Sequence, residues 1–269
     1  MTSLLEIDNL VIHAGRKSLV TDLSFSIFAG ERLGLIGESG SGKSLTALAA
    51  IGLLPDALKA SGSVLLDGQQ VIGARDRDLV PLRGTAAAVV FQEPLTALDP
   101  LVKIGRQVGE AVKRRAKRDR RTTDKESTAK EVLALLDQVA LPEPQRIIDA
   151  WPHEVSGGQR QRAAIAMALA CKPKLLIADE PTTALDVTTQ AEILALLADL
   201  VRERDMALLF ISHDLPVVAG AVDRVVVMQH GRIVESGSVS DVFRQPSHPY
   251  TQSLVAAARA FDEALEIAK

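Results

Sequence analysis

Apolar residues along the chain cluster in short, nearly continuous runs. Four of these runs are AAAVVF, KLLIAD, ALLFIS and RVVVMQ, at residues 86–91, 174–179, 207–212 and 224–229. Such runs are typical of strands in a parallel sheet whose two faces are both covered. Between the second and third runs, residues 191–200 repeat apolar side chains at helical spacing. Strand and helix therefore alternate, which predicts an open α/β sheet.

The first third of the chain follows a different pattern. Residues 4–12 and 19–28 alternate apolar and polar positions and are bounded by glycine turns, which predicts two short strands. Residues 61–72, SGSVLLDGQQVI, resemble a hairpin with its turn at Asp67 and Gly68.

Residues 102–150 predict a mainly helical insert, because the helical pattern EVLALLDQVAL lies between a charged run and two prolines. The charged run, KRRAKRDRR at residues 113–121, holds seven basic residues, a composition that can indicate nucleic-acid binding. It has no interleaved aromatic residues, however, and acidic residues lie nearby. We therefore interpret the run as a solvated helix face that binds no nucleic acid.

Composition narrows the class of protein. The 269 residues permit one large α/β domain with inserts, and 47% hydrophobic residues supply a sizeable core. The net charge of −3 gives no general attraction to nucleic acid or to an anionic membrane. A single cysteine, Cys171, excludes an internal disulfide and a cysteine zinc cluster, and we expect it to be a small buried hydrophobe. No secretory signal is visible and no apolar run approaches the roughly 18 residues that span a bilayer, so we expect a soluble, cytoplasmic chain.

A glycine-rich stretch carries the first sign of chemistry. The apolar run LGLI predicts a buried strand, the residues after it match G-x-x-x-x-G-K-[ST], and an apolar helical pattern follows. Glycines let backbone N–H groups turn inward, and a helix N-terminus adds unpaired donors. In such a loop Lys43 reaches the β- and γ-phosphates and the Ser44 hydroxyl binds Mg²⁺, which predicts a nucleoside triphosphate as ligand. The predicted phosphate loop consists of Gly37, Glu38, Ser39, Gly40, Ser41, Gly42, Lys43 and Ser44.

An acidic pair follows another predicted strand. In LLIADE, four apolar residues precede Asp179 and Glu180. Asp179, at the strand end, is the expected Mg²⁺ ligand of a phosphate-loop enzyme. Glu180, one residue further, is the expected general base for the attacking water.

The stretch WPHEVSGGQRQR, residues 151–162, precedes an apolar helical run and predicts a second helix N-terminus suited to phosphate. By itself the stretch is better interpreted as a plain N-cap with a glycine turn. It lies about twenty residues before the acidic strand, and this arrangement resembles the ATP-binding-cassette (ABC) family. VSGGQ is similar to the family's signature loop, with valine where leucine is usual. The residues that the resemblance assigns to phosphate binding are Ser156, Gly157, Gly158 and Gln159.

Further motifs occur in family order. Gln92 of FQEP resembles the family's glutamine loop, which contacts Mg²⁺ and links to the membrane subunits. Ala184, Leu185 and Asp186 of PTTALD resemble the loop that crosses to the partner's nucleotide site. His213 of ISHD is similar to the switch histidine that contacts the γ-phosphate, and we expect it to be catalytic with Glu180 and Gln92.

One position departs from the family pattern. Many cassettes stack adenine on an aromatic residue in the first strand pair, where this chain has only Ile12, His13 and Ala14. Either His13 or an aliphatic contact replaces the aromatic ring.

The resemblance implies the fold class: a RecA-like phosphate-loop NTPase core, α/β, with an N-terminal antiparallel β subdomain and a helical signature subdomain. We expect a single nucleotide-binding domain over residues 1–269. Residues 1–91 and 163–240 form its catalytic core with the β subdomain, residues 92–162 the helical insert, and residues 241–269 a C-terminal tail.

Two stretches narrow the branch of the family. FQEPLTALDPLVKIG at residues 91–105 and HPYT within residues 245–258 look like segments of bacterial oligopeptide, dipeptide and nickel importers. Several members carry a cysteine-rich C-terminal extension for an iron–sulfur cluster. With one cysteine, this chain cannot supply such a cluster from its own ligands.

The resemblance therefore implies an ATP-binding and hydrolysing subunit that powers an importer of peptides or of a related small solute such as nickel. Its partners would be a second cassette paired head to tail, two transmembrane permease subunits and an extracytoplasmic solute-binding protein. Its place would be the cytoplasmic face of the inner membrane, bound peripherally through the permeases. Two alternatives stay open: an ABC-type ATPase acting on DNA or ribosomes, and a non-hydrolysing, ATP-dependent assembly subunit.

Overall fold

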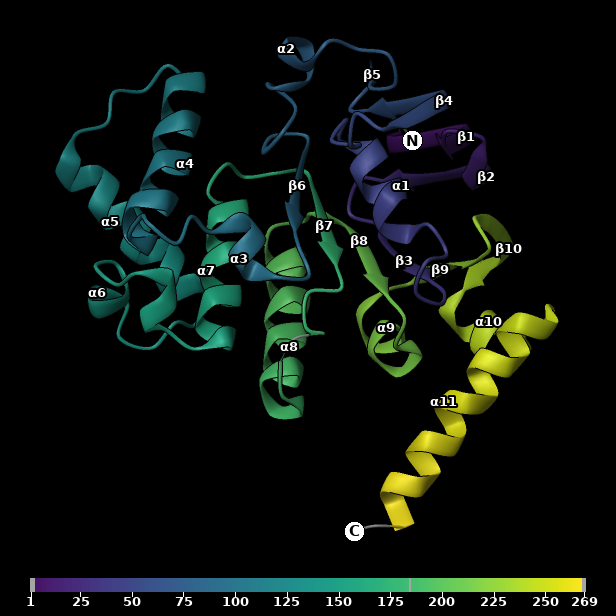
Figure 1. The fold of residues 1–269 in the computed structure, drawn as a ribbon. Coiled ribbons are helices and arrows are strands. Elements are labelled where there is room, and N and C mark those ends of the chain that lie inside the picture. The colour runs from purple at the N-terminus through teal and green to yellow at the C-terminus, as the bar shows by residue number, and fades with distance from the viewer. Residues whose placement is uncertain (1–2, 184, 268–269) are drawn as a thin grey trace. The chain divides into compact units, whose positions relative to one another are not determined.

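The computed structural model describes residues 3–183 and 185–267, so that Ala184 of the PTTALD loop lies outside the described residues. The chain divides into two compact units (Figure 1). The first comprises the described residues up to Leu82 and from Asp205 onward, and the second is Arg83–Arg204. The division of residues 1–269 into core, insert and tail stays a prediction.

The first unit holds two sheets, and Figure 1 colours its elements purple to blue and then green to yellow. Its elements in chain order are β1 (Ser3–Ala14), β2 (Lys17–Phe28), β3 (Arg32–Ile36), α1 (Lys43–Ala50), β4 (Leu58–Leu66), β5 (Gln69–Gln70), α2 (Asp76–Leu79), β8 (Ala207–Ser212), α9 (Leu215–Ala221), β9 (Arg224–Gln229), β10 (Arg232–Ser238), α10 (Val239–Arg244) and α11 (Pro249–Ile267).

The N-terminal sheet is antiparallel, with the strand order β2-β1-β4-β5. It confirms the strands predicted from alternation near the N-terminus and the hairpin after them. The turn of that hairpin falls at Asp67 and Gly68, which both have positive φ, 50° and 79°. Two successive positive φ values define the type I′ turn that suits a tight hairpin, so an Asp-Gly pair is favoured there.

The second sheet of this unit follows the order β10-β9-β3-β8. Strand β3 pairs in parallel with β8 on one side and with β9 on the other, and β10 is antiparallel to β9. Leu33, Leu35 and Ile36 of β3 are fully buried. Gly34 lies under α9, because a Cβ there would come within 2.6 Å of Val218. Strand β3 is therefore enclosed on both edges and covered closely by a helix.

The second unit contains one parallel strand pair and a group of helices. Its elements are β6 (Ala87–Val90), α3 (Pro94–Ala97), α4 (Ile104–Arg118), α5 (Lys125–Gln138), α6 (Pro144–Ile147), the short 3₁₀ helix η1 (Pro152–Glu154), α7 (Gly157–Leu169), β7 (Leu175–Asp179) and α8 (Val187–Glu203). Helices α4, α5 and α7 pack against one another (Figure 1). Residues 102–150 are thus mainly helical, as predicted.

The basic run at residues 113–121 is solvated except at Arg115 and Ala116, so its interpretation as a solvated helix face is wrong at these two positions. Buried residues of α4 recur at Ile104, Val108 and Val112. A residue three positions beyond Val112 shares that face, because i and i+3 lie on one side of a helix. Arg115 therefore points inward and is only 3% exposed.

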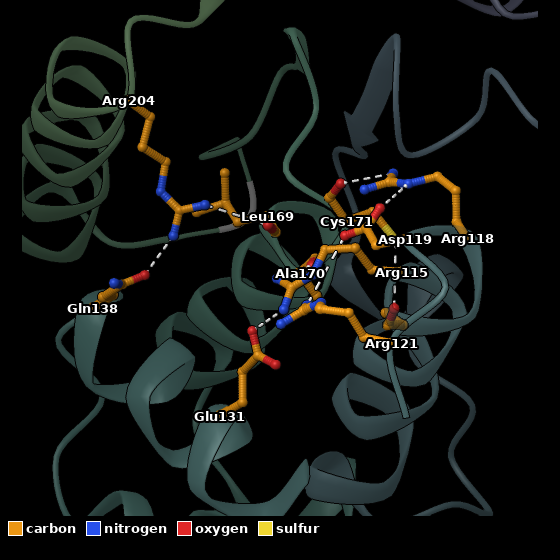
Figure 2. Close-up of polar contacts among 11 residues, drawn as sticks. Arg115, Arg118, Asp119, Arg121, Glu131, Gln138, Leu169, Ala170, Cys171 and Arg204 are labelled. Carbon is orange, nitrogen blue, oxygen red and sulfur yellow. Dashed lines mark hydrogen bonds and ion pairs between the residues drawn. The ribbon is translucent and has the colours of Figure 1, made fainter. Parts of the chain in front are cut away.

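Arginines surround the carboxyl end of α7 (Figure 2). Arg115 donates to the Ala170 carbonyl oxygen at 2.9 Å and also pairs with the Glu131 carboxylate. Arg118 donates to the carbonyl oxygen of Cys171 and Arg204 to that of Leu169. The last carbonyls of a helix have no partner within the helix and carry its negative dipole end. These guanidinium groups supply both the hydrogen bonds and the compensating charge.

Cys171 lies just after α7 and is half-buried, whereas the sequence analysis predicted a buried residue. Its thiol donates to the Ala111 carbonyl oxygen at 3.5 Å. Burial raises the pKa of this thiol, against the opposing effect of Arg118 and Arg115. Across the part of the chain that the structure describes, we find no helix with the length and apolar character of a bilayer span.

Arg115→Ala should lower the free energy of unfolding by about 2–3 kcal/mol, because it leaves a buried carbonyl without a donor and removes the partner of Glu131. Lys113→Ala is the matched control: its side chain is 52% exposed, and its loss should change stability by less than about 0.5 kcal/mol. Denaturant unfolding followed by the fluorescence of Trp151, the single tryptophan, reports on the same unit. An equal loss of unfolding free energy in the two variants would contradict the structural role of Arg115.

Candidate functional site

The predicted phosphate loop occupies the turn between β3 and α1 in the first unit. Gly37 has φ +152°, and a Cβ there would lie 2.2 Å from the Met228 carbonyl oxygen of β9. Gly42, the N-cap of α1, has φ +101°, and a Cβ would lie 2.8 Å from Val20. The first and last glycines of the motif are thus required both by backbone conformation and by space.

Lys43 folds back over the loop and is only 4% exposed. Its Nζ donates to the carbonyl oxygens of Gly37 at 2.8 Å and of Glu38 at 2.9 Å. Ser41 is also buried, and its hydroxyl has no hydrogen-bond partner among the described residues. A buried cation and an unsatisfied hydroxyl in a glycine turn fit a ligand that offers anionic oxygens.

Ser44 lies in the first turn of α1 and is exposed. No side chain caps this helix, whose N-cap is a glycine. The N-terminus of α1 therefore has backbone donors that its own cap does not satisfy, as the prediction of a phosphate site requires.

His213 follows β8 directly and is exposed. Because Ile36 of β3 pairs with Ser212 of β8 in a parallel register, the phosphate loop and His213 both leave the sheet at the carboxyl ends of neighbouring strands. Ligands of open α/β sheets bind at such ends. The structure thus brings His213 and the loop to the same edge of the sheet.

The acidic pair ends strand β7 in the second unit. Asp179 is 8% exposed, whereas Glu180 is half-buried with φ +46°. The Glu180 carboxylate accepts a hydrogen bond from the Thr183 hydroxyl at 3.1 Å. Strand β6 pairs in parallel with β7 and places exposed Gln92 just beyond its own carboxyl end. Asp179, Glu180 and Gln92 therefore lie at the same end of the β6–β7 strand pair.

The signature stretch forms the start of α7. Ser156 is its N-cap: the hydroxyl accepts from the Gln159 amide at 3.3 Å, and the Gln159 side chain accepts from the Ser156 amide at 3.0 Å. This reciprocal pair is a capping box. The plain N-cap anticipated from the sequence is therefore present. The cap leaves Ser156 able to form a further hydrogen bond, because a hydroxyl that accepts from an amide still has its own proton to donate.

The two glycines of the signature lie against the segment that carries Asp186. A Cβ at Gly158 would come within 2.5 Å of Thr189, and a Cβ at Gly157 within 3.3 Å of Leu185. Asp186 caps α8 by accepting from the Thr189 amide at 3.0 Å and from its hydroxyl at 2.8 Å. The hydrogen bond from the Thr189 amide holds the pKa of Asp186 below its usual value. The second unit thus brings the signature and Asp186 together.

The three residues at the expected adenine contact differ in burial. Ile12 of β1 is fully buried, whereas His13 and Ala14 are half-buried. Of the three residues, only His13 and Ala14 therefore have surface that a base could contact.

The predicted site residues thus fall into two groups, each brought together within its own unit. The phosphate loop and His213 lie in the first unit, and Gln92, Asp179, Glu180, the signature and Asp186 lie in the second. One contact has no local sequence signal: the Tyr250 hydroxyl accepts a hydrogen bond from the Glu38 amide of the phosphate loop at 2.8 Å. The HPYT motif marks the residue, but not its partner 212 positions earlier.

Comparison with known proteins adds independent evidence. The family model described as ABC transporter matches residues 20–183. The glutathione import ATP-binding protein GsiA of Pectobacterium atrosepticum is 47% identical over 266 residues, which cover 95% of this chain and 42% of that protein. The oligopeptide transport ATP-binding protein OppD of Bacillus subtilis is 43% identical over 262 residues, 95% of this chain and 72% of that protein. The chain thus spans less than half of the first relative's length.

A solved structure agrees with the fold. An ATP-binding cassette in a dimeric, post-hydrolysis state bound to ADP and Pi superposes with a TM-score of 0.74 at 29% identity, covering 87% of this chain and 98% of that one. This likeness confirms the predicted α/β cassette with its N-terminal antiparallel sheet. Together with the family match over residues 20–183 and the identities above 40%, it shows that the chain belongs to the ABC transporter family, as one of its ATP-binding subunits.

Proposed function

We propose that this chain hydrolyses ATP to power an importer of peptides. The observation that carries the ATPase role is the glycine turn with Lys43 folded onto the carbonyl oxygens of Gly37 and Glu38, which holds a cation ready for a polyphosphate. The substrate class rests on the two relatives, whose names specify glutathione import and oligopeptide transport. Both names refer to peptides, so peptides are favoured over nickel.

Each predicted residue has a distinct role in this proposal. The loop amides and Lys43 bind the phosphates, and Glu180 takes a proton from the attacking water. His213 contacts the γ-phosphate. Ser44, Gln92 and Asp179 offer hydroxyl, amide and carboxylate oxygens, which are the donors that Mg²⁺ prefers. A bound Mg²⁺ ion would neutralise charge on the β- and γ-phosphates.

The signature residues serve a second cassette. The dimeric relative is an assembly of ATP-binding cassettes, which supports pairing of two copies or of two paralogues. We propose that the pairing is head to tail, so that Ser156–Gln159 of one cassette cover the ATP held by Gly37–Ser44 of the other. Ser156 is exposed, and its hydroxyl, which accepts from the Gln159 amide, still has its own proton to donate. ATP then stabilises the closed pair, and hydrolysis removes that differential affinity.

The remaining partners follow from the transport role. We propose two transmembrane permease subunits, which would hold the chain at the cytoplasmic face of the inner membrane, and an extracytoplasmic solute-binding protein. Gln92 and the helices after it would transmit closure to the permeases.

Glu180→Gln should leave ATP binding intact while hydrolysis falls by roughly two or more orders of magnitude, as for a lost general base. The variant should accumulate as an ATP-bound dimer on size-exclusion chromatography. Glu126→Gln, an exposed amide substitution in α5, is the control and should keep wild-type turnover. Undiminished turnover in Glu180→Gln would remove Glu180 from the reaction.

Two further variants separate the two phosphate-binding elements. Lys43→Ala should abolish ATP binding by the isolated chain, because Lys43 serves its own nucleotide. Ser156→Arg should leave binding by the monomer intact but block dimer closure and hydrolysis, because the side chain fills the partner's site. Both can be measured by ATP titration calorimetry beside turnover.

Ser156→Asp guards against a folding artefact, because Asp is as good an N-cap as Ser. It should preserve α7 yet still block hydrolysis by repelling the partner's phosphates. Equal loss of ATP binding in monomeric Lys43→Ala and Ser156→Arg would exclude the head-to-tail sandwich.

The specific ATPase activity of the purified chain should rise with protein concentration, because each site needs Ser156 from a second cassette. Permease subunits and then a loaded binding protein should raise turnover further, since both favour the closed state. Added DNA or RNA should change nothing. A rate that is independent of concentration in a confirmed monomer, or strong stimulation by nucleic acid, would favour the alternative of an ATPase acting on DNA or ribosomes. Absence of turnover in the full complex would favour the non-hydrolysing subunit.

A further inference from the structure

The C-terminal HPYT segment contacts the phosphate loop directly within the first unit. The backbone N–H of Glu38 donates to the Tyr250 hydroxyl oxygen at 2.8 Å. Tyr250 is the single tyrosine of the chain and lies in the first turn of α11. A segment near the end of the chain thus satisfies a backbone donor of the loop.

Glu38 occupies a central place in that loop. Its carbonyl oxygen accepts from Lys43 Nζ at 2.9 Å and from the Ser41 amide at 3.2 Å. Its N–H is held by Tyr250, and its side chain lies 3.5 Å from His230. The N–H and the carbonyl oxygen of Glu38 therefore connect Tyr250 to Lys43, the residue proposed to bind the phosphates.

Tyr250 is itself held in place. The Glu235 carboxylate of β10 accepts from the backbone amides of Ser247 at 2.7 Å and of His248 at 3.0 Å. The Nδ1 atom of His248 in turn accepts from the Tyr250 amide at 3.2 Å. Burial raises the pKa of Glu235, but several opposing interactions, of which the hydrogen bond from the Ser247 amide is the largest, together hold its pKa below its ordinary value. The segment before α11 is therefore fixed by an ionised carboxylate at neutral pH.

The same helix is seated in the core of its unit. Thr251 is fully buried and Val255 is 4% exposed, and α11 packs against α9. Tyr250 itself is half-buried. Its hydroxyl therefore reaches the loop from a rigid base rather than from a free surface side chain.

We propose that Tyr250 is a positioning residue of the phosphate loop, through which the C-terminal segment sets the affinity for ATP. This inference rests on the proposed role of Gly37–Ser44 in phosphate binding. A glycine-rich loop loses conformational entropy when it closes on a ligand. Holding the Glu38 peptide in place before ATP arrives reduces that cost, because preorganisation raises affinity without a new ligand contact.

Tyr250→Phe removes only the hydroxyl and should weaken ATP binding about five-fold, the usual worth of one hydrogen bond. The KM for ATP should rise by the same factor while kcat at saturating ATP stays within about two-fold, because the loop is positioned alike in the ground and transition states. A merely structural role would lower thermal stability and the active fraction, and hence kcat, with KM unchanged. Calorimetric titration with ATP and steady-state kinetics measure both.

Ser253→Ala is the matched control, because it removes an exposed hydroxyl that donates to the Tyr250 carbonyl oxygen on the same helix. It should leave both KM and affinity unchanged. Glu235→Ala should raise KM in the same direction as Tyr250→Phe. The effects of the two should not add in the double variant, because both act through one contact.

Lys43→Ala separates the two proposals. If Lys43→Ala abolishes ATP binding and Tyr250→Phe leaves both affinity and KM unchanged, the positioning role is excluded while the phosphate loop stands. If Lys43→Ala itself binds ATP normally, the role of the loop fails and the inference fails with it. A KM that rises equally in Ser253→Ala and Tyr250→Phe would also overturn the role of the hydroxyl.

Discussion

The turn at Gly37 is the constraint on which the phosphate loop depends. Strand β3 is paired on both edges and is buried, so the chain must leave the sheet at one fixed point. At that point the Met228 carbonyl oxygen leaves no space for a side chain. The backbone therefore enters the loop with φ +152°, and the positions of Glu38 and Lys43 follow from it. A larger residue at Gly37 would displace the loop as a whole.

Two candidate residues, and the neighbour of a third, are helix N-caps. Ser156 caps α7, Asp186 caps α8, and Asp214, next to His213, caps α9 by accepting from the Val217 amide. A helix N-terminus needs acceptors for its free amides and also attracts anions. The residues that begin a helix therefore lie where a phosphate is favoured, and local folding already fixes their side chains.

Features that depend on nearby residues could be predicted from the sequence. The Asp67-Gly68 turn, the buried strands and the helix after Lys43 each follow from the local pattern, and the structure has them. The burial of Arg115 could also have been predicted from the spacing of Val108 and Val112, but charge composition concealed it. The contact between Tyr250 and Glu38 could not, because it joins residues 212 positions apart. Such a contact arises only when β10 has paired with β9 and α11 has packed against α9, which no local pattern encodes.

The left-handed backbone of Glu180 has a consequence for how this position can change over evolutionary time. With φ +46°, a β-branched or bulky residue would be strained there, whereas Gly, Asn and Asp tolerate this conformation best. The backbone conformation at this position therefore limits the substitutions that it tolerates without strain to small or polar residues. Replacement by Gly, Asn or Asp would therefore keep the backbone of the turn after β7, whereas a β-branched residue would strain it.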